Sequence, residues 1–248
     1  MCGRLNMSLD PADLVDELDI DTVGHRFSPR YNVPPGAVLP IIVDRPAETG
    51  EAVRRLESAR WGLVPGWAKD EKIGFRAFNA RSETVASKPM FRAAFARRRC
   101  AIPVAGYYEW QADDSGAKTP WLMHAPEGQL YMAGLFEFRR RPEPEGEGGG
   151  DDSADPAVRD GWLVSSTILT TASAGHLAEV HDRMPVMIRA RDIPAWIDPT
   201  AGADEAQSVL DELLAGFDPA AVERYRVRRE VGNVRNQSAD LTEPVDDE

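Results

Sequence analysis

Three stretches near the middle of the chain decide the fold. They read CAIPVAGYYEWQ at residues 100–111, PWLMHA at 120–125 and LYMAGLFEF at 130–138. Each is short, rich in β-branched and aromatic residues, and followed by turn-forming residues such as Asp, Ser, Gly and Pro. This pattern predicts consecutive strands of an antiparallel sheet.

The flanking sequence mixes helices and strands without regular alternation. Helices are expected at residues 10–19, with Asp10 as N-cap and Pro11 in the first turn, and at 87–99, 190–198 and 204–217. Further strands are expected within residues 30–43, 161–173 and 184–188. The order predicts an α+β fold with a mainly antiparallel, partly barrel-like sheet flanked by helices.

Residues 142–158 differ in composition from the rest of the chain. They are rich in Gly and Pro and hold six acidic residues but no basic residue. Such a segment buries too little apolar surface to offset the entropy of ordering. We predict a disordered acidic loop at 142–158 and a short acidic tail at 244–248, both within a single domain spanning residues 1–248.

Composition excludes several classes of protein. No apolar run approaches the roughly 18 residues of a membrane span, and the N-terminus lacks a signal-peptide pattern. We therefore expect a cytoplasmic monomer that makes no membrane contact and is nucleoid-associated when bound to DNA. The two cysteines, Cys2 and Cys100, form neither a disulfide framework nor a zinc motif, so we expect no metal and no organic cofactor. Cys100 is interpreted as a buried strand residue.

Charge is unevenly distributed along the chain. The formal net charge of -12 argues against nucleic acid as a partner. Residues 60–100, however, hold ten basic and three acidic residues. A local basic stretch indicates polyanion binding better than net charge does, although a solvated helix face is an equally good explanation on charge alone.

The N-terminal sequence MCGR places Cys2 directly after the initiator Met1. Removal of Met1 leaves Cys2 with a thiol and a free amine, whose ordinary pKa is about 7.7–8.0. A nearby cation would lower the thiol's ordinary pKa of about 8.5. The thiol can attack an acyl carbon, or the amine can condense with an aldehyde before the thiol closes a thiazolidine ring. Position alone also fits an incidental cysteine or an N-terminal-nucleophile amidotransferase.

Eight motifs occur in a fixed order along the chain. They are MCGR (1–4), RYNVPPG (30–36), WGLVPGWAKD (61–70), FNARSET (78–84), KPMFRAAFARRRCAIPVAGYYEW (88–110), TILTTAS (167–173), HDRMPVMI (181–188) and VGNVRNQ (231–237). Together they closely resemble the SRAP family, the SOS response-associated peptidases, over roughly residues 2–245. Members of this family sense abasic sites in single-stranded DNA and cross-link to them during the DNA damage response.

The resemblance implies both a function and a set of working residues. It implies an SRAP-type fold, a covalent thiazolidine link between Cys2 and an abasic site in single-stranded DNA, a self-processing peptidase activity and a weak abasic-site lyase activity. Its catalytic residues match Cys2, Asn79, Glu109 and His181. Its DNA-binding residues match Arg4, Trp67, Arg81, Thr170 and Arg183. Family members often carry a second aromatic residue where this chain has Ala68, which predicts fewer stacking contacts with bases.

Side-chain chemistry fits these catalytic roles. Glu109 lies between two aromatic residues, and partial burial would raise its pKa and suit it to proton transfer. His181 has an ordinary pKa near neutrality and could protonate the ring oxygen of the closed sugar. Asn79 could hold the amine or the sugar oxygen. The alternatives are a solvent-facing carboxylate, a structural histidine and a turn-forming asparagine.

The candidate DNA contacts follow from spacing. Arg81 and Arg183 each come two residues after a catalytic candidate, which on a strand places them on the same face. Their planar guanidinium groups suit bidentate phosphate binding.

RWGLVPGWAKD at residues 60–70 predicts a short strand that breaks into a Pro-Gly loop. Trp61 is expected in the core, and Trp67 is expected to be exposed, where it can stack on a base.

Two other functions stay open from the residues alone. An N-terminal cysteine peptidase or amidohydrolase acting without DNA would hydrolyse glutamine or a peptide. A non-catalytic single-strand binder would be unaffected by Cys2→Ala. His25, His124 and His176 lack a comparable setting and are interpreted as structural.

Overall fold

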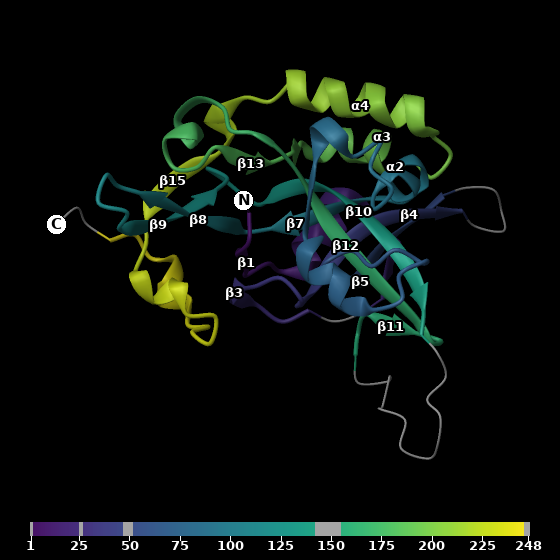
Figure 1. The fold of residues 1–248 in the computed structure, drawn as a ribbon, viewed down its shortest axis with the longest axis horizontal. Coiled ribbons are helices and arrows are strands. Elements are labelled where there is room, and N and C mark those ends of the chain that lie inside the picture. Colours follow the sequence, from purple (N-terminus) through teal and green to yellow (C-terminus); the bar gives the residue numbers. More distant parts are fainter. Residues whose placement is uncertain (1, 25–26, 47–51, 142–154, 246–248) are drawn as a thin grey trace, which may run out of the picture.

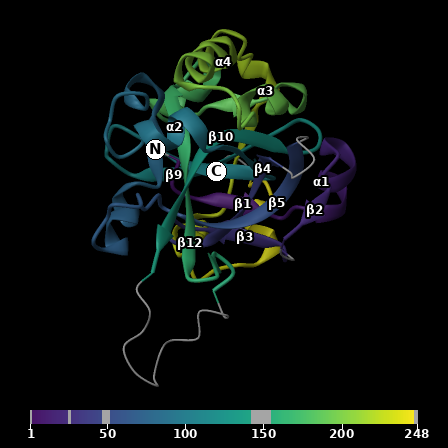
Figure 2. The same ribbon diagram turned by 90° about the vertical axis from the view of Figure 1, so that its right-hand side faces the viewer.

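The computed structural model describes residues 2–24, 27–46, 52–141 and 155–245 of the chain. In these ranges two β-sheets pack together with four α-helices. The helices are α1 (Pro11–Leu18), α2 (Arg92–Arg97), α3 (Ile193–Ile197) and α4 (Ala203–Ala215). Helices α2, α3 and α4 gather on one side of the sheets, at the top of Figure 1, and a view turned by 90° keeps α3 and α4 above the strands (Figure 2).

Five long strands of the larger sheet close into a ring. They are β4 (Val38–Pro46), β5 (Ala52–Trp61), β7 (Arg99–Val104), β10 (Leu130–Arg140) and β12 (Trp162–Ala172). Antiparallel pairs run in the order β12-β10-β7-β4-β5, and a parallel pairing of β5 with β12 closes the ring. The predicted α+β class with a mainly antiparallel, partly barrel-like sheet is therefore confirmed.

Short strands extend this ring at its edges. They are β2 (Thr22–Val23), β6 (Asn79–Arg81), β11 (Val158–Arg159), β13 (Arg183–Pro185) and β14 (Met187–Ile188). Strand β6 runs parallel to β12, and β13 pairs with the same strand in antiparallel fashion. Three segments that are distant in sequence therefore meet along the end of β12.

The smaller sheet places the start of the chain beside a central strand. Its order is β15 (Glu223–Arg226), β9 (Lys118–His124), β8 (Gly106–Ala112), β1 (Leu5–Met7) and β3 (Arg30–Val33). Leu5 lies opposite Tyr107, so the residues just before β1 lie alongside β8. This pairing fixes the position of Cys2, three residues before Leu5.

The three stretches that open the sequence analysis form strands, but they do not all share one sheet. Strand β7 pairs with β10 in the ring, whereas β8 pairs with β9 in the smaller sheet. The chain changes sheet at Ala105, whose N–H donates to Asn6 O at 3.0 Å. Because β1 pairs with β8, β8 leaves the ring to meet the N-terminal strand.

Two helices show how far the local sequence determined the helix ends. Asp10 caps α1 as predicted, since its side chain accepts from Ala12 N at 2.9 Å. Helix α2 is shorter than the expected 87–99, because Arg99 already begins β7. The strand predicted within 60–70 is in turn longer, since β5 pairs with β4 along its whole length.

The cores lie inside the ring and beneath the helices. Trp61 is fully buried, as expected, and its indole N–H donates to Phe78 O at 2.8 Å. Phe95 and Trp196 pack α2 and α3 against each other, with ring centroids 6.2 Å apart. Cys100 is fully buried in β7, also as expected. No helix in the described ranges is long and apolar enough to cross a membrane.

The predicted acidic loop at 142–158 was placed too far toward the C-terminus. Residues 142–154 lie outside the described ranges, but Asp155 forms an ion pair with Arg60, Ala157 is fully buried and Val158 begins β11. Packing of these last residues against the ring outweighs their polar composition. Residues 246–248 of the predicted tail at 244–248 also lie outside the described ranges, while Val245 N donates to Arg226 O at 3.0 Å.

Candidate functional site

Cys2 is buried at the centre of the site. It has no exposed surface, and Asn79 Nδ2 on β6 donates to Cys2 O at 2.6 Å. The chain still carries Met1, so the nitrogen of Cys2 is part of a peptide bond. The structure therefore shows Cys2 before its amine is released.

The environment of the Cys2 thiol favours its neutral form. Burial raises the pKa of the thiol well above its ordinary value, and the nearby charge of Glu109 raises it further. The sequence had allowed for a cation that would lower this pKa, but burial is the dominant effect. The site thus holds a thiol rather than a thiolate.

Glu109 lies on β8 and is only 4% exposed. Burial raises the pKa of its carboxyl group, and the charge of His181 lowers it in part. The direction of this shift agrees with the effect expected from partial burial. A carboxyl group with a raised pKa can exchange a proton at a pH closer to neutral than an ordinary glutamate can.

His181 reaches the site from a loop. It lies between a 3₁₀ helix (Gly175–Glu179) and β13, so the same-face argument from strand spacing does not apply to His181 and Arg183. Its Nδ1 accepts from Arg183 N at 3.0 Å, which places the proton of the neutral ring on Nε2. Asp182 Oδ1 lies 2.9 Å from the same Nδ1 and would pair with the protonated ring. Both protonation states of the imidazole therefore have a partner.

The four predicted catalytic residues converge from separate parts of the chain. Cys2 precedes β1, and the three others come from β6, β8 and the loop before β13. Sequence reasoning missed Tyr107, a fully buried neighbour. Burial raises the pKa of Tyr107 well above its ordinary value, and the charge of Glu109 raises it further. Its position two residues before Glu109 on one strand could have indicated this shared face.

Arg81, Thr170 and Arg183 meet where three strands lie side by side. Arg81 ends β6 opposite Thr170 of β12, and Arg183 begins β13. Arg183 Nη2 donates to Thr170 O at 2.6 Å. Arg183 also pairs with Glu83, a residue that the sequence analysis did not consider.

Arg4 is already held by contacts within the protein. Its Nη1 donates to Asn32 Oδ1 and to Val231 O, both at 2.7 Å. Its guanidinium group also lies over the ring of Trp110, 5.6 Å from the centroid. These contacts tie the N-terminus to the C-terminal part of the chain, and the predicted contact of Arg4 with DNA stays a prediction.

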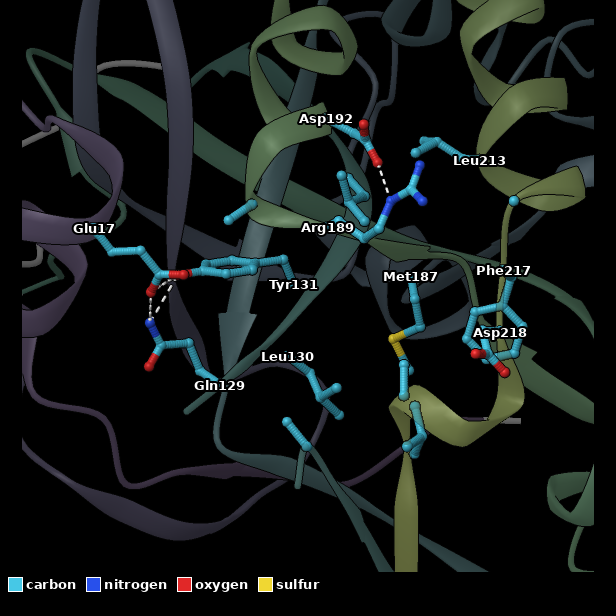
Figure 3. Close-up of a pocket in the computed structure, with 16 residues that line it drawn as sticks. Glu17, Gln129, Leu130, Tyr131, Met187, Arg189, Asp192, Leu213, Phe217 and Asp218 are labelled. Atoms are coloured by element: carbon cyan, nitrogen blue, oxygen red, sulfur yellow. Dashed lines mark hydrogen bonds and ion pairs between the residues drawn. The ribbon is translucent and has the colours of Figure 1, made fainter. Parts of the chain in front are cut away.

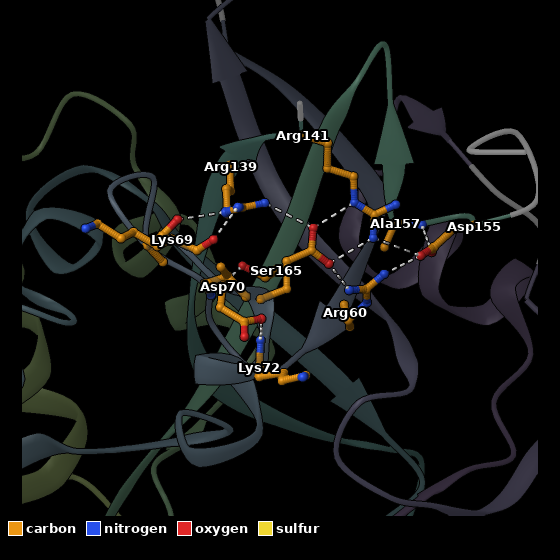
Figure 4. Close-up of polar contacts among 12 residues, drawn as sticks. Arg60, Lys69, Asp70, Lys72, Arg139, Arg141, Asp155, Ala157 and Ser165 are labelled. Atoms are coloured by element: carbon orange, nitrogen blue, oxygen red, sulfur yellow. Dashed lines mark hydrogen bonds and ion pairs between the residues drawn. The ribbon is translucent and has the colours of Figure 1, made fainter. Parts of the chain in front are cut away.

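Trp67 is 63% exposed on a loop that is firmly attached to the ring. Arg139 Nε of β10 donates to Ala68 O at 3.0 Å, and Arg139 Nη1 to Glu71 Oε1 at 3.1 Å (Figure 4). Hydrogen bonds from Arg141 and Arg60 hold the pKa of Glu71 down at about 2. This loop is therefore a rigid support for an exposed indole ring.

Phe75 is a second exposed aromatic residue near the same loop. It is 65% exposed, and its ring lies against the turn at Gly36, where a Cβ would come within 3.3 Å of Phe75 Cε1. No periodic pattern in the sequence marks Phe75, so it was not among the predicted DNA-binding residues.

The histidines outside the site contact the backbone. His124 and His176 lie 2.6 Å and 2.9 Å from the carbonyl oxygens of Ala125 and Val222. His25 lies outside the described ranges. Among the residues that the structure describes, no group of three or more His, Cys, Asp or Glu side chains could hold a metal ion.

Comparisons with known proteins agree with the resemblance seen in the sequence. A curated relative, the abasic site processing protein YoaM of Bacillus subtilis, is 34% identical and covers 97% of each chain. The abasic site processing protein YedK of Escherichia coli is 28% identical over 99% of this chain and 100% of its own. The rat protein HMCES, with the same description, is 27% identical over 99% of this chain and 76% of its own.

A solved structure shares the fold. A protein from Bacteroides thetaiotaomicron superimposes with a TM-score of 0.73 over 98% of this chain and 100% of its own, at 20% identity. The family profile described as SOS response associated peptidase (SRAP) matches residues 1–234. The chain therefore belongs to the SRAP family.

Proposed function

We propose that this protein senses abasic sites in single-stranded DNA and, once Met1 is removed, bonds covalently to them through Cys2. The observation that carries this proposal is the convergence of two buried residues, Cys2 and Glu109, with two half-buried ones, Asn79 and His181. Curated relatives that span the whole chain are named abasic site processing proteins, which supports the same substrate.

The first step joins the amine of Cys2 to the sugar. An abasic deoxyribose opens to an aldehyde at C1′, and protonation of the ring oxygen by His181 promotes this opening. The amine nitrogen attacks C1′ and water leaves, which gives an imine. Glu109 moves the protons that this condensation requires. The carbonyl oxygen of the Asn79 amide is buried without a hydrogen-bond partner among the described residues, and the released amine would supply a donor for it.

The second step closes the ring. The Cys2 sulfur adds to the imine carbon, and the thiol proton ends on the nitrogen, so the thiazolidine forms without a leaving group. A thiol kept neutral by burial suits this order, because the amine reacts first and the thiol proton is needed afterwards.

Two minor activities accompany this chemistry. An imine that is not captured by the thiol can undergo β-elimination at the neighbouring phosphate, which amounts to a weak lyase activity. The peptidase activity corresponds to removal of Met1 by the protein itself.

The DNA contacts are mainly to phosphate and to base faces. Arg81 and Arg183 lie beside the catalytic residues and can pair with phosphate oxygens. Trp67 and Phe75 offer exposed rings for stacking, worth roughly 1–3 kcal/mol per base. Contacts of these kinds carry little base-sequence preference.

A cysteine peptidase or amidohydrolase acting without DNA is the alternative from another class. Such an enzyme attacks through a thiolate, whereas burial and Glu109 favour the neutral thiol of Cys2. The site therefore supports the amine as first nucleophile better than the thiol.

One gel tests the proposal. The purified protein is mixed with single-stranded DNA carrying one uracil, before and after uracil glycosylase, and then boiled in SDS. We expect a shifted band only with the abasic strand, its loss in Cys2→Ala, and its retention in the control Cys100→Ala. No shift with intact protein, or glutamine hydrolysis in the absence of DNA, would overturn the proposal.

A further inference from the structure

Glu83 pairs with Arg183, one of the two arginines that the proposed function assigns to phosphate. Arg183 Nη1 lies 2.5 Å from Glu83 Oε1, and Arg183 Nη2 lies 3.0 Å from Glu83 Oε2. The hydrogen bonds from Arg183 lower the pKa of Glu83, and the charges of Arg183 and Arg81 add to this effect. The Glu83 carboxylate is therefore the counterion of Arg183 and also lies within the electrostatic influence of Arg81.

The ion pair with Glu83 uses both terminal nitrogens of the Arg183 guanidinium group. Both terminal nitrogens point at Glu83, and Nη2 also donates to Thr170 O at 2.6 Å. The Arg183 side chain is only 12% exposed, whereas that of Glu83 is 49% exposed. The arginine is thus held in place while its partner lies at the surface, where an incoming anion can replace it.

A carboxylate and a phosphate present the same pair of oxygen atoms to a guanidinium group. A phosphate that pairs bidentately with the terminal nitrogens of Arg183 must take the position of the Glu83 carboxylate. The two anions also repel each other at this distance, so they cannot both stay.

We propose that Glu83 is an internal mimic of a DNA phosphate, which occupies the phosphate position on Arg183 until DNA displaces it. The inference rests on the proposed function of the site. Glu83 acts as a positioning residue, because together with Thr170 it keeps Arg183 oriented before DNA arrives. It also sets specificity, because binding of undamaged DNA must expel a carboxylate and is weakened accordingly. At an abasic site the covalent bond retains the strand after the exchange.

The test compares single-stranded DNA binding by the wild-type protein and Glu83→Gln. Glutamine keeps the shape of the side chain but removes its charge. We expect undamaged DNA to bind about two- to fivefold tighter, the size of one exposed ion pair. We also expect log affinity to fall more steeply with log salt, by about 0.7 in slope, because without the displaced carboxylate nearby the phosphate position is more positive by one charge.

Two further variants separate this effect from overall charge and from folding. Asp192→Asn removes one charge from the Arg189–Asp192 ion pair in a pocket of about 430 Å³ at another place on the surface (Figure 3). This matched control should leave both affinity and salt slope at the wild-type values. Glu83→Asp keeps the charge and should restore the wild-type salt slope, which a purely structural defect would not do.

The outcomes are distinct. If the wild-type protein cross-links abasic DNA but Glu83→Gln binds undamaged DNA no more tightly and with an unchanged salt slope, the inference is wrong and the proposed function stands. If the wild-type protein neither binds nor cross-links abasic DNA, the proposed function fails and the inference fails with it.

Discussion

Asn79 links the N-terminus to the barrel through one hydrogen bond. Its amide donates to Cys2 O at 2.6 Å, and β6 is held in turn by β12. The position of the reactive residue therefore depends on a side chain 77 positions away in the sequence.

The first prediction concerns this bond. Asn79→Ala should slow cross-linking about fivefold to tenfold, because a single hydrogen bond is worth about 1 kcal/mol. Single-turnover gels over time measure this rate. Ser208→Ala, on the exposed surface of α4, is the control and should react like the wild-type protein. An unchanged rate in Asn79→Ala would show that the amide does not orient Cys2.

The second prediction concerns pH. Because burial raises the pKa of Glu109, its carboxyl group keeps its proton at pH values where an ordinary glutamate has lost it. The wild-type rate should therefore change with pH above the ordinary glutamate value of 4.5, and Glu109→Gln should lose this limb of the profile. General acid–base catalysis typically contributes about 10²–10⁴-fold, which is the expected loss of rate. If Glu109→Gln keeps the same pH dependence of the rate as the wild-type protein, a group other than Glu109 is responsible for that dependence.

At the scale of elements, the Trp67 loop depends on a network of ion pairs. Glu71 joins Arg60 of β5 to Arg139 of β10, with N–O distances of 2.7 and 3.1 Å, and Arg141 adds a third contact (Figure 4). These contacts attach the 3₁₀ helix (Glu71–Arg76) to the ring. Side chains from two strands therefore reinforce the loop, in addition to the turn that Ala68 N closes on Pro65 O at 2.9 Å.

The third prediction follows from the pKa of Glu71. Its folded-state pKa of about 2 lies below the ordinary 4.5, so the ionised carboxylate stabilises the fold fully above 4.5. This contribution is lost as pH falls from 4.5 toward about 2. Glu71→Gln should lower the unfolding free energy near neutral pH by about 1 kcal/mol, or the melting temperature by about 2–4 °C. Urea unfolding should show this difference shrinking below pH 4.5, and a constant difference would contradict the argument.

The fourth prediction concerns the attachment of α3 to the ring. Arg99 is 3% exposed and donates to four carbonyl oxygens, those of Phe95, Trp196, Asp198 and Ala201. Arg99→Met leaves these acceptors unsatisfied and should destabilise the protein by about 3 kcal/mol in urea unfolding. Arg97→Met, on the exposed side of α2, should change the midpoint little. Equal effects of the two variants would mean that the buried hydrogen bonds do not hold α3.

The sequence predicted elements well where local signals were complete, as with the capped helix α1 and the strands β8 and β9. The start of β5 was not predicted from the sequence. Charged residues such as Arg54 and Arg55 interrupt its apolar pattern, and the ion pairs that they form with Asp44 and Glu57 appear only in the folded structure. The sequence also could not give the division of strands between sheets, since pairing of β1 with β8 is a long-range contact.

The candidate site was predictable as a set of residues but not as an arrangement. Spacing and resemblance pointed to Glu109 and His181, whereas the loop position of His181 depends on tertiary packing. Glu83 was hidden because a carboxylate within a basic stretch gives no signal until its arginine partner, 100 residues away, is brought beside it.

For the whole molecule, the structure revises the interpretation of charge. Several of the basic residues between 60 and 100 are internal: Arg60 pairs with Glu71, Arg98 pairs with Glu137, and Arg99 is buried. The basic stretch is therefore not one continuous DNA-binding surface. Combined with the net charge of -12, this predicts weak non-specific binding.

The fifth prediction follows from this weak binding. Equilibrium binding of undamaged single strands should fall steeply with salt, by a slope of about 0.7 for each phosphate contact. The covalent product does not dissociate, so the yield of cross-link after long incubation should fall much less. Filter binding and denaturing gels at the same salt concentrations measure the two quantities. Parallel loss of both would mean that capture is not retained covalently.

The burial of Cys2 has a consequence for the lifetime of the reagent in the cell. An aminothiol free in solution condenses with any small aldehyde and is readily oxidised, so an exposed N-terminal cysteine would be consumed by metabolites before meeting a lesion. Cys2 has no exposed surface in this structure, and its thiol is held neutral. While Met1 remains, the peptide bond withholds the amine and burial withholds the thiol, so the proposed reagent is stored in an unreactive form.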